Sequence, residues 1–305
     1  MTYLLQIVTA GLATGSVYAL VALGIVLIYK CSGVVNFAQG GYAMLGAYCT
    51  YALTCAGLSP GVAVLGSMLV MAAVGAGTEF VLLRRMLKAP VVSVMMVTLG
   101  LLILFRALCL ALWGPDQIAF PKLFPEGSLD LGGILLTYNY VAAAALSLVL
   151  SLGFLAFYRF TPMGLMQRCA ADNGRAALAV GIHVSNQVSM AWAVSSALAG
   201  LGGSLLATLN SLSLGLSSIG LVAFPVIVLG GLTSLMGSLV AGLLLGVLEG
   251  ITDGVLTPAL EGFLRAHTSI YSVGALQQVV PYLLVGFMLL IRPQGILGAR
   301  GTERV

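Results

Sequence analysis

Charged residues are scarce in this sequence. It has 13 Lys and Arg residues and 9 Asp and Glu residues, which together make up 7% of its 305 residues. A soluble domain carries roughly 25% charged residues, because its surface must be solvated by water. Hydrophobic residues account for 60% of the chain, and the mean hydropathy is +1.10. These values exclude an ordinary soluble globule and predict that lipid solvates most of the surface.

Histidine is rarer still, with only His183 and His267 in the chain. Two histidines are too few for a histidine-based metal site. The five cysteines are an odd number, and no pair has the close spacing that is typical of metal ligands. We expect the cysteines to act as small apolar residues in the packing. The sequence therefore predicts neither a metal site nor a cofactor.

The residues of a nucleotide hydrolase are also missing. A P-loop ends in Gly-Lys-[Ser/Thr], where backbone N–H groups and the lysine hold the phosphates. None of the three lysines, Lys30, Lys88 and Lys122, follows a glycine. No Ser/His/Asp set, nucleophile elbow or HExxH motif is present either. We therefore expect a protein that is not an enzyme, and any energy for transport would come from another chain.

Apolar runs long enough to cross a bilayer follow one another along the whole chain. The first run, Leu4–Tyr29, is uncharged, follows no Lys or Arg and is too long for a signal peptide, so we expect it to remain as a span. Because a membrane helix needs about 20 apolar residues, the sequence predicts an all-α polytopic membrane protein with about 8–9 transmembrane helices. These helices form a single domain, residues 1–305. The expected spans are Leu4–Tyr29, Gly40–Cys55, Gly61–Leu83, Val91–Trp113, Ile134–Tyr158, Gln187–Leu209, Ser217–Leu232, Gly237–Leu256 and Gln277–Ile291.

Two of these spans, Gly40–Cys55 and Ser217–Leu232, are short and contain glycines. Each is interpreted either as a broken or re-entrant segment or as a helix whose ends the sequence does not define. Irregular backbone at membrane depth must be enclosed by protein or line a cavity. Interrupted segments are therefore typical of transport pathways. Pro225 lies within an apolar run and is an expected break.

Lys and Arg are distributed unevenly among the loops. If the chain crosses the membrane at each expected span, 10 of the 13 basic residues fall on one side. Because short cytoplasmic loops carry an excess of Lys and Arg, we expect the N-terminus outside and the C-terminus in the cytoplasm. This insertion bias accounts for the basic loops, so no nucleic-acid partner is expected. The ten residues are Lys30, Arg84, Arg85, Lys88, Arg159, Arg168, Arg175, Arg292, Arg300 and Arg304.

Four charged residues lie within the expected spans: Glu79, Arg106, Glu249 and Asp253. Glu79 is about one helical turn from the basic residues 84–85 and is expected to pair with them. Arg106 lies deep in a span, where a charge is costly. It is expected to pair with a carboxylate of a solute or of the protein, such as Glu249, or to extend to the membrane surface. Glu249 and Asp253 are four residues apart and are expected to face a polar interior or a subunit contact.

The longest expected cytoplasmic segment, residues 159–186, contains a short helix. Asp172 or Asn173 is expected to cap this helix, because a short side-chain oxygen accepts from its first free backbone N–H groups. The apolar stretch Arg175–Val180 forms the helix, and Gly181 suits the position after its end. A helix this short is not stable alone. We therefore expect it to dock in a groove of a cytoplasmic partner or on the lipid headgroups.

This segment resembles the coupling loop of ABC importer permeases, in which Glu-Ala-Ala is followed by three residues and a glycine. Arg175 stands in place of the glutamate, and the two alanines and the glycine occur at the same spacing. The resemblance implies that the segment contacts an ATPase. The implied coupling residues are Asp172, Asn173, Arg175, Ala176, Ala177 and Gly181.

A longer resemblance begins near the N-terminus, with the run GLATGSVYALVALGIVLIYKCSGVVNFAQGGYAMLGAY at Gly11–Tyr48. This run is similar to the opening of the branched-chain amino acid permeases of the LivH/LivM type. The later blocks Val228–Gly237 and Arg292–Gly298 agree with the same family, and all the blocks occur in family order. Two positions depart from the family pattern: Lys30 stands where a glycine is common, and Gly41 where an acidic residue is common.

The resemblance implies a complex in the lipid bilayer of the bacterial inner membrane. Its other members are a second homologous permease subunit, two cytoplasmic ATP-binding subunits and a periplasmic solute-binding protein. The implied function is import of branched-chain amino acids or related small polar solutes by alternating access, driven by the partner ATPases. The alternative is a stand-alone channel or ion-coupled carrier for a small polar solute, which would need no ATPase.

In the importer, the short spans supply the candidates for the solute pathway. The segments Asn36–Gly46 and Phe224–Gly237 are expected to change their exposure during transport. Their polar and helix-breaking residues would line the path. These candidate pathway residues are Asn36, Gln39, Gly40, Ser217, Ser218 and Pro225.

Overall fold

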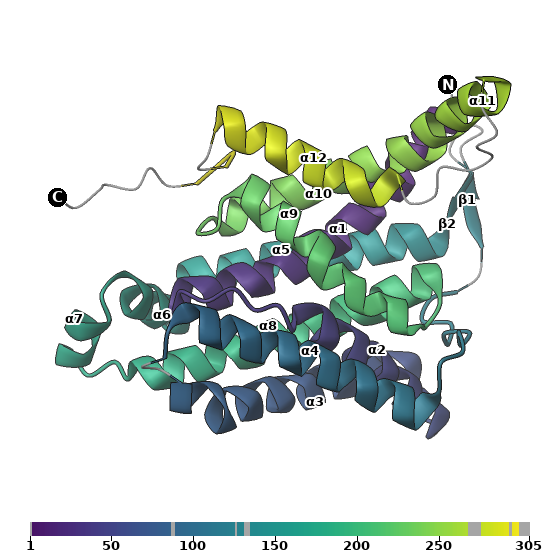
Figure 1. Ribbon diagram of the computed structural model, residues 1–305. Coiled ribbons are helices and arrows are strands. Elements are labelled where there is room, and N and C mark those ends of the chain that lie inside the picture. Colours follow the sequence, from purple (N-terminus) through teal and green to yellow (C-terminus); the bar gives the residue numbers. More distant parts are fainter. Residues whose placement is uncertain are drawn as a thin grey trace.

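The computed structural model describes residues 2–86, 89–125, 127–130, 135–267, 276–292 and 295–298. It is almost entirely helical, which confirms the expected all-α class (Figure 1). Strands β1 (Ser128–Asp130) and β2 (Leu135–Thr137) form a short antiparallel hairpin. The helices are α1 (Thr2–Ser32), α2 (Gln39–Cys55), α3 (Pro60–Val81), α4 (Val91–Trp113), α5 (Tyr138–Phe160), α6 (Pro162–Asp172), α7 (Gly174–Ala179), α8 (Val184–Asn210), α9 (Ile219–Gly230), α10 (Leu235–Ile251), α11 (Thr257–His267) and α12 (Leu276–Ile291).

Six helical segments of the described chain are long and apolar enough to cross a membrane, which confirms a multi-pass membrane protein. Two shorter apolar segments, Leu214–Gly230 and Val279–Ile291, and the 17-residue helix α2 account for the remaining expected spans. Every expected span therefore overlaps a helix. The span expected from Ile134 differs at its start, because Leu135–Thr137 form strand β2 and the helix begins at Tyr138. The six long segments are Tyr3–Ser32, Pro60–Met86, Val91–Trp113, Tyr138–Phe160, Val184–Asn210 and Leu235–Leu264.

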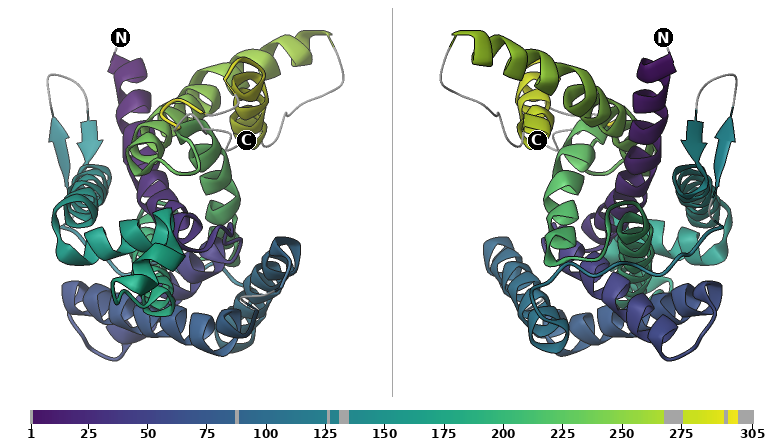
Figure 2. Two further views of the ribbon diagram at one scale, coloured as in Figure 1. Left: turned by 90° about the vertical axis from the view of Figure 1, so that its left-hand side faces the viewer. Right: turned by 90° about the vertical axis from the view of Figure 1, so that its right-hand side faces the viewer.

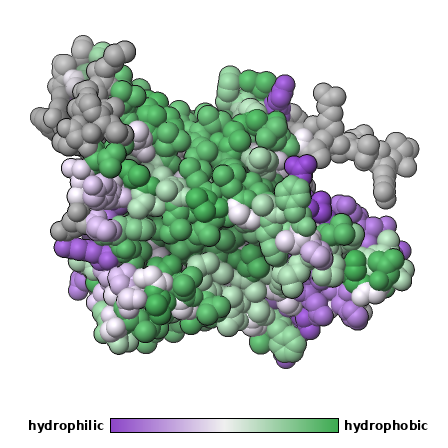
Figure 3. All heavy atoms as spheres, turned by 180° about the vertical axis from the view of Figure 1, so that it is seen from behind, coloured by the Kyte–Doolittle hydropathy of each residue, from purple (hydrophilic) through white to green (hydrophobic). Residues whose placement is uncertain are grey.

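Helices α1 and α8 form the centre of the bundle. In their most apolar windows 83% and 78% of the residues are buried, against 22–28% in α3, α4 and α5. Figure 2 shows these three helices at the periphery. Their outward faces carry exposed Leu, Val, Ile and Phe residues, and Figure 3 shows an apolar band between two more hydrophilic ends. Lipid at the sides and water at the ends would solvate such a surface.

Glycines allow α10 to approach α1 closely. A Cβ atom on Gly11 would lie 2.6 Å from the carbonyl oxygen of Gly246, and one on Gly15 would lie 2.6 Å from that of Gly242. A larger residue at either position would push the two helices apart. Small residues have this role in membranes because lipid is as apolar as the side chains, so close packing must hold the helices together.

The chain between α1 and α2 is irregular, and residues 34–38 are mostly buried (Figure 1). Side chains accept hydrogen bonds from several backbone N–H groups of this stretch. The Phe37 N–H donates to Thr98 Oγ1 at 3.3 Å, and the Ala38 N–H donates to Asn36 Oδ1 at 3.0 Å. Such bonds replace water around backbone that is enclosed by protein. The irregularity expected near the second span thus lies just before α2, while α2 itself is continuous.

Three elements are additional to those that the sequence predicts: α6, α11 and the β1–β2 hairpin. Helix α6 begins at Pro162, and the Oγ1 atom of Thr161 caps it by accepting from the Gly164 N–H at 3.1 Å. Threonine followed by proline is a recognisable helix start. Helix α11 continues the α10 segment after a π-helical turn, Thr252–Leu256.

Candidate functional site

A polar cavity of about 500 Å³ lies among α1, α5, α8, α9, α10 and α12. Its lining residues come from the N-terminal part of α1, the start of α5 and the last residues of α8 and α10. Figure 1 shows these helix ends in the half of the bundle that carries the N-terminus and the β1–β2 hairpin. Its volume falls in the range of about 300–1,000 Å³ that is usual for small-molecule sites. The polar residues that line it include Tyr18, Tyr140, Asn210, Ser218, Glu249 and Asp253.

Glu249 and Asp253 place two carboxyl groups at the wall of this cavity, and Asp253 is exposed. Tyr18 on α1 lines the same wall as Glu249. Asp253 lies in the π-helical turn, where Thr257 Oγ1 donates to the Thr252 carbonyl oxygen at 2.9 Å. A π-helical turn inside a helix is frequent at functional sites.

Helix α9 continues through Pro225 to its end at Gly230, so the break expected at this proline is absent. Proline has no N–H group, so the carbonyl of Leu221, four residues earlier, lacks its helical partner. The hydroxyl group of Tyr282 on α12 donates to this carbonyl at 3.2 Å. Leu221 and Tyr282 both line the cavity. The α-helical part of the expected span Ser217–Leu232 instead begins only at Ile219. A separate 3₁₀ helix, Leu214–Ser218, lies between α8 and α9.

Asn36 and Gln39 are buried and bonded to the protein. The Nε2 atom of Gln39 donates to the carbonyl oxygens of Ser195 at 3.2 Å and Val21 at 3.4 Å. Its Oε1 atom accepts from Ser195 Oγ at 3.1 Å and Asn36 Nδ2 at 3.2 Å. These bonds join the start of α2 to α1 and α8. Both side chains therefore hold helices together in this conformation, and neither lines the polar cavity.

Gly40 allows α2 to contact the turn before α9. A Cβ atom on Gly40 would overlap the Ser217 carbonyl oxygen and lie 2.8 Å from the Gly220 nitrogen. Ser217 is buried, and its hydroxyl donates to the Leu214 carbonyl oxygen at 2.8 Å. The next residue, Ser218, is exposed and lines the cavity. Of the six candidate pathway residues, Ser218 is thus the one at the cavity wall.

Packing accommodates the two departures from the family pattern. The Lys30 ammonium lies 5.3 Å from the centroid of the Tyr158 ring, a favourable cation–π geometry. A Cβ atom on Gly41 would lie 3.0 Å from Phe105 and 3.3 Å from Leu102, both on α4. A longer side chain at position 41 would therefore require the Phe105 and Leu102 side chains to move.

Helices α6 and α7 lie at the end of the bundle opposite the hairpin (Figure 1). The Oδ1 atom of Asn173 accepts from the N–H groups of Arg175 and Ala176, each at 3.1 Å. Asn173 is therefore the cap of α7, and Asp172 is the last residue of α6. The short helix that the sequence predicts is present and begins at Gly174, one residue earlier than expected.

The end of α7 also follows the prediction. Gly181 has a φ of +86°, which glycine adopts readily. The Ile182 N–H donates to the Ala177 carbonyl oxygen at 2.9 Å, as in a Schellman motif. Beside this end, Leu178 is 57% exposed and Val180 is 75% exposed. The segment thus presents apolar side chains away from the bundle.

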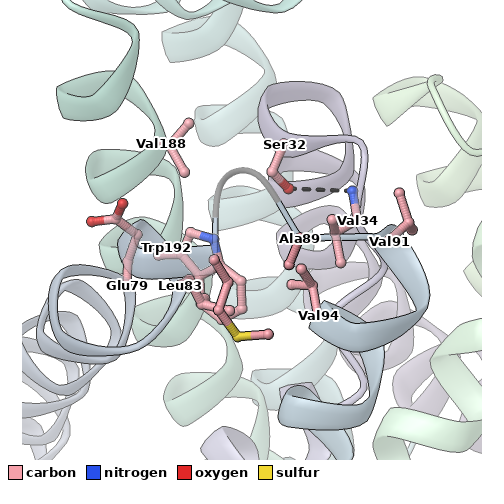
Figure 4. A pocket seen from close by; sticks show the side chains of 10 residues that line it. Ser32, Val34, Glu79, Leu83, Ala89, Val91, Val94, Val188 and Trp192 are labelled. Carbon is pink, nitrogen blue, oxygen red and sulfur yellow. Dashed lines mark hydrogen bonds between the residues drawn. The ribbon is translucent and has the colours of Figure 1, made fainter.

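Glu79 pairs with Arg84 as expected, with Oε1 and Nε 3.6 Å apart. Ser189 on α8 donates to the other carboxylate oxygen and accepts from Arg84 Nη2 at 3.0 Å. This group links α3 to α8 beside a second cavity of about 140 Å³, which Trp192 and Val188 help to line (Figure 4). That cavity is smaller and mostly apolar, so the larger one is the better candidate for a polar solute.

Arg106 is exposed on α4 and does not pair with Glu249. In the part of the chain that the structure describes, its guanidinium group has no hydrogen bond or ion pair. Because α4 is peripheral, the side chain reaches the lateral surface of the bundle. A charge at membrane depth requires a polar environment, so Arg106 must extend to the headgroups or meet a group outside this chain.

Four cavity residues, Tyr18, Tyr140, Asn210 and Tyr282, are absent from the candidates that the sequence suggests. Each lies in or at the end of an apolar span, on four different helices. The available signal was a polar side chain within a membrane helix. That signal identifies a site only after the helices are assembled, because the residues are far apart in the chain.

Residues 7–291 match the family model described as the permease component of the branched-chain amino acid transport system. The chain is 27% identical to the high-affinity branched-chain amino acid transport system permease protein LivH of Escherichia coli (strain K12) and 26% identical to LivH of Salmonella typhimurium. It is also 27% identical to the corresponding permease protein BraD of Pseudomonas aeruginosa, and each comparison covers 99% of this chain and 98% of the relative. No solved structure matches the chain. Because the family model spans most of its length, the protein belongs to the family of permease components of branched-chain amino acid transport systems.

Proposed function

We propose that the protein is the membrane-spanning permease subunit of an ABC importer for branched-chain amino acids or related small polar solutes. It moves solute by alternating access, driven by partner ATPases. The proposed complex contains a second homologous permease subunit, two cytoplasmic ATP-binding subunits and a periplasmic solute-binding protein. Family membership and the transport role in the relatives' names support this proposal.

The observation that carries the ATP-driven mechanism is the α6–α7 segment. Helix α7 is too short to be stable alone, is capped by Asn173 and exposes Leu178 and Val180. We assign Asp172–Gly181 as the surface that docks on an ATPase. Closure of the ATPases would push this segment. Because it leads directly into α8, at the centre of the bundle, the movement would reach the other helices.

In the proposed orientation the α6–α7 end faces the cytoplasm, with the N-terminus outside and the C-terminus inside. The basic residues Lys30, Arg84 and Arg159 support it, since they lie at or beside the ends of α1, α3 and α5, and Arg168 lies within α6 itself. A fluorescent protein that matures only in the cytoplasm, fused to either terminus, tests the orientation. We expect fluorescence from the C-terminal fusion alone, and the reverse pattern would contradict it.

We further propose that the solute pathway passes between α2 and α9. The irregular backbone before α2 and the proline in α9 support this, because such features are typical of transport sites. In the described conformation Gln39 is bonded to Ser195. Those bonds would open when α2 moves, and the amide would then join the path. The proposed pathway residues are Asn36, Gln39, Gly40, Ser217, Ser218 and Pro225.

Gentle purification from the native membrane tests the importer. We expect an ATPase to accompany the chain, and its activity to rise with a binding protein loaded with one class of solute. An Asn173→Ala, Leu178→Ser double variant should lose the ATPase during purification, whereas the matched Thr257→Ala, Val255→Ser variant at the opposite end should retain it. Loss of the ATPase from both variants, or from neither, would contradict the assigned docking surface.

A second candidate function is an ion-coupled carrier. Glu249 and Asp253 favour it, because carboxylates inside membrane spans often mark ion pathways. Purified chain in liposomes discriminates between the two functions. Solute uptake that follows an ion gradient without ATP or any partner would establish the carrier, whereas uptake only in the presence of the ATPase would establish the importer.

A further inference from the structure

Two carboxyl groups line the polar cavity, and the described residues of its wall supply no basic side chain to pair with them. Glu249 and Asp253 both line it, and no Lys, Arg or His is among the described residues at its wall. The neutral side chain of Tyr18 lines the same wall as Glu249. A carboxylate has about four lone-pair sites for hydrogen bonds. One tyrosine hydroxyl leaves most of these sites free for a ligand that donates several hydrogen bonds.

Groups that suit the other parts of an amino acid are also present. Asn210 and Ser218, on the segments before α9, bring an amide and a hydroxyl to the wall. The Asn210 amide can donate to a ligand oxygen, whereas the Ser218 hydroxyl, which already donates to the Gly215 carbonyl oxygen at 2.8 Å, can accept from a ligand donor. Leu221 and Val222 on α9 supply apolar surface. The wall therefore combines acidic, donor and apolar regions.

The backbone around the cavity is irregular on two sides. Asp253 lies in the π-helical turn that follows α10. On the facing helix, Pro225 leaves the Leu221 carbonyl to accept from Tyr282. Interrupted helices surround solute sites in transporters, because their free backbone groups and loose packing allow local movement. These two irregularities are observations independent of the acidic charge.

We propose that this cavity holds the solute during transport and that Glu249, with Asp253 one turn away, is the counter-charge for the solute's ammonium group. The permease then carries solutes with a protonated amino group, not neutral amides or carboxylic acids without one. This inference rests on the proposed transport function. It adds a solute-binding site centred on Glu249, Ser218 and Asn210 to the proposed transport function. This site is separate from the hydrogen bonds that Gln39 of α2 forms.

Thiol labelling measures the charge of the cavity directly. The starting protein has its five native cysteines replaced by alanine, and Ser218→Cys then adds one thiol at the wall. The labelling rate with a cationic reagent, trimethylammonium-ethyl methanethiosulfonate, is compared with the rate for an anionic reagent, sulfonatoethyl methanethiosulfonate. The reference is a chain that retains the native Cys55, which is exposed at the end of α2. We expect the ratio of the cationic to the anionic labelling rate to be at least about tenfold higher for Ser218→Cys than for this reference, because acidic clefts concentrate cations.

Two variants show where this preference originates. Adding Glu249→Gln and Asp253→Asn to Ser218→Cys should bring the ratio of rates to within about twofold of the Cys55 reference, as the focusing charge is removed. Ser217→Cys is the matched control, because that neighbouring residue is buried and does not line the cavity. It should label slowly with both reagents. A Ser218→Cys protein without cation preference, or one that does not label, would overturn the proposal.

Three probes of similar shape then identify the recognised group. Leucine has both charged groups, isoamylamine has only the ammonium, and isocaproate has only the carboxylate. We expect leucine and isoamylamine to slow the labelling of Ser218→Cys, and isocaproate to leave it unchanged. Protection by isocaproate equal to that by isoamylamine, or protection by none of the three, would overturn the assignment of Glu249.

Failure of the ammonium site can be distinguished from failure of the proposed importer function. Labelling and protection need only this chain, in membranes without ATP. Co-purification of an ATPase together with a neutral, unprotected cavity would leave the importer in place and remove the ammonium site. A cation-selective, protected cavity in a chain that transports without an ATPase would retain the site and overturn the importer.

Discussion

The side chain of Gln39 on α2 forms two hydrogen bonds with one residue of α8, Ser195. Its nitrogen donates to the Ser195 carbonyl oxygen at 3.2 Å, and its oxygen accepts from the Ser195 hydroxyl at 3.1 Å. The same oxygen accepts from Asn36 at 3.2 Å. A fully buried amide thus fixes the start of a short helix against the central helix of the bundle.

Replacing Gln39 by leucine should lower stability. The change leaves the Ser195 hydroxyl and the Asn36 amide short of partners in an apolar environment, where each unsatisfied group costs about 1–3 kcal/mol. We expect the free energy of unfolding in detergent to fall by about 2–4 kcal/mol, as measured by denaturant titration. Gln6→Leu is the control, because Gln6 is partly exposed and its side chain has no hydrogen bond within the described chain. Equal stability of the two variants would contradict the role of these bonds.

Gly46→Ala should also destabilise the fold. Its Cβ atom would overlap the backbone of Gly200 where α2 crosses α8. Overpacking of this kind costs about 1–3 kcal/mol, which thermal unfolding in detergent will measure. Gly100→Ala has nothing within 4 Å of the added atom, and should stabilise α4 by about 0.5–1 kcal/mol, since alanine is the better helix residue. The opposite order of stability would show that α2 and α8 are not closely packed.

The hydrogen bond from Tyr282 to Leu221 should depend on Pro225. Tyr282→Phe removes a bond of 3.2 Å and should cost about 0.5–1.5 kcal/mol. In a Pro225→Ala background, residue 225 regains an N–H group that can bond to the Leu221 carbonyl within the helix. The same Tyr282→Phe change should then cost less. A double-mutant cycle on unfolding free energies measures the difference, and strictly additive effects would contradict the coupling.

Asn173→Ala should loosen α7. The loss of a cap that accepts from Arg175 and Ala176 costs about 1 kcal/mol, or about a fivefold shift in the local opening equilibrium. Hydrogen exchange followed by mass spectrometry should show faster exchange in the peptide that contains α7. Asp172→Ala is the matched control, because Asp172 does not cap this helix. Equal exchange in the two variants would assign no capping role to Asn173.

The candidate site was only partly predictable. Glu249 and Asp253 are recognisable because carboxylates are rare in membrane spans, and both reach the cavity. Ser218 was a candidate from its polar character in a short span and also reaches it. Asn36 and Gln39 have the same polar character, but their neighbours in other helices satisfy them. Sequence does not distinguish a polar residue that faces a cavity from one that bonds to a carbonyl of another helix.

The membrane location, the order of the spans, and the cap and end of α7 could be predicted from local stretches of sequence. These properties depend on hydropathy, charge and capping within a few neighbouring residues. The central position of α1 and α8, and the cavity shared by Tyr18, Glu249 and Tyr282, became apparent only from the packed helices. The reason is that nearly every face of these helices is apolar, so periodicity does not indicate which faces meet. Close contacts between small residues select the partners.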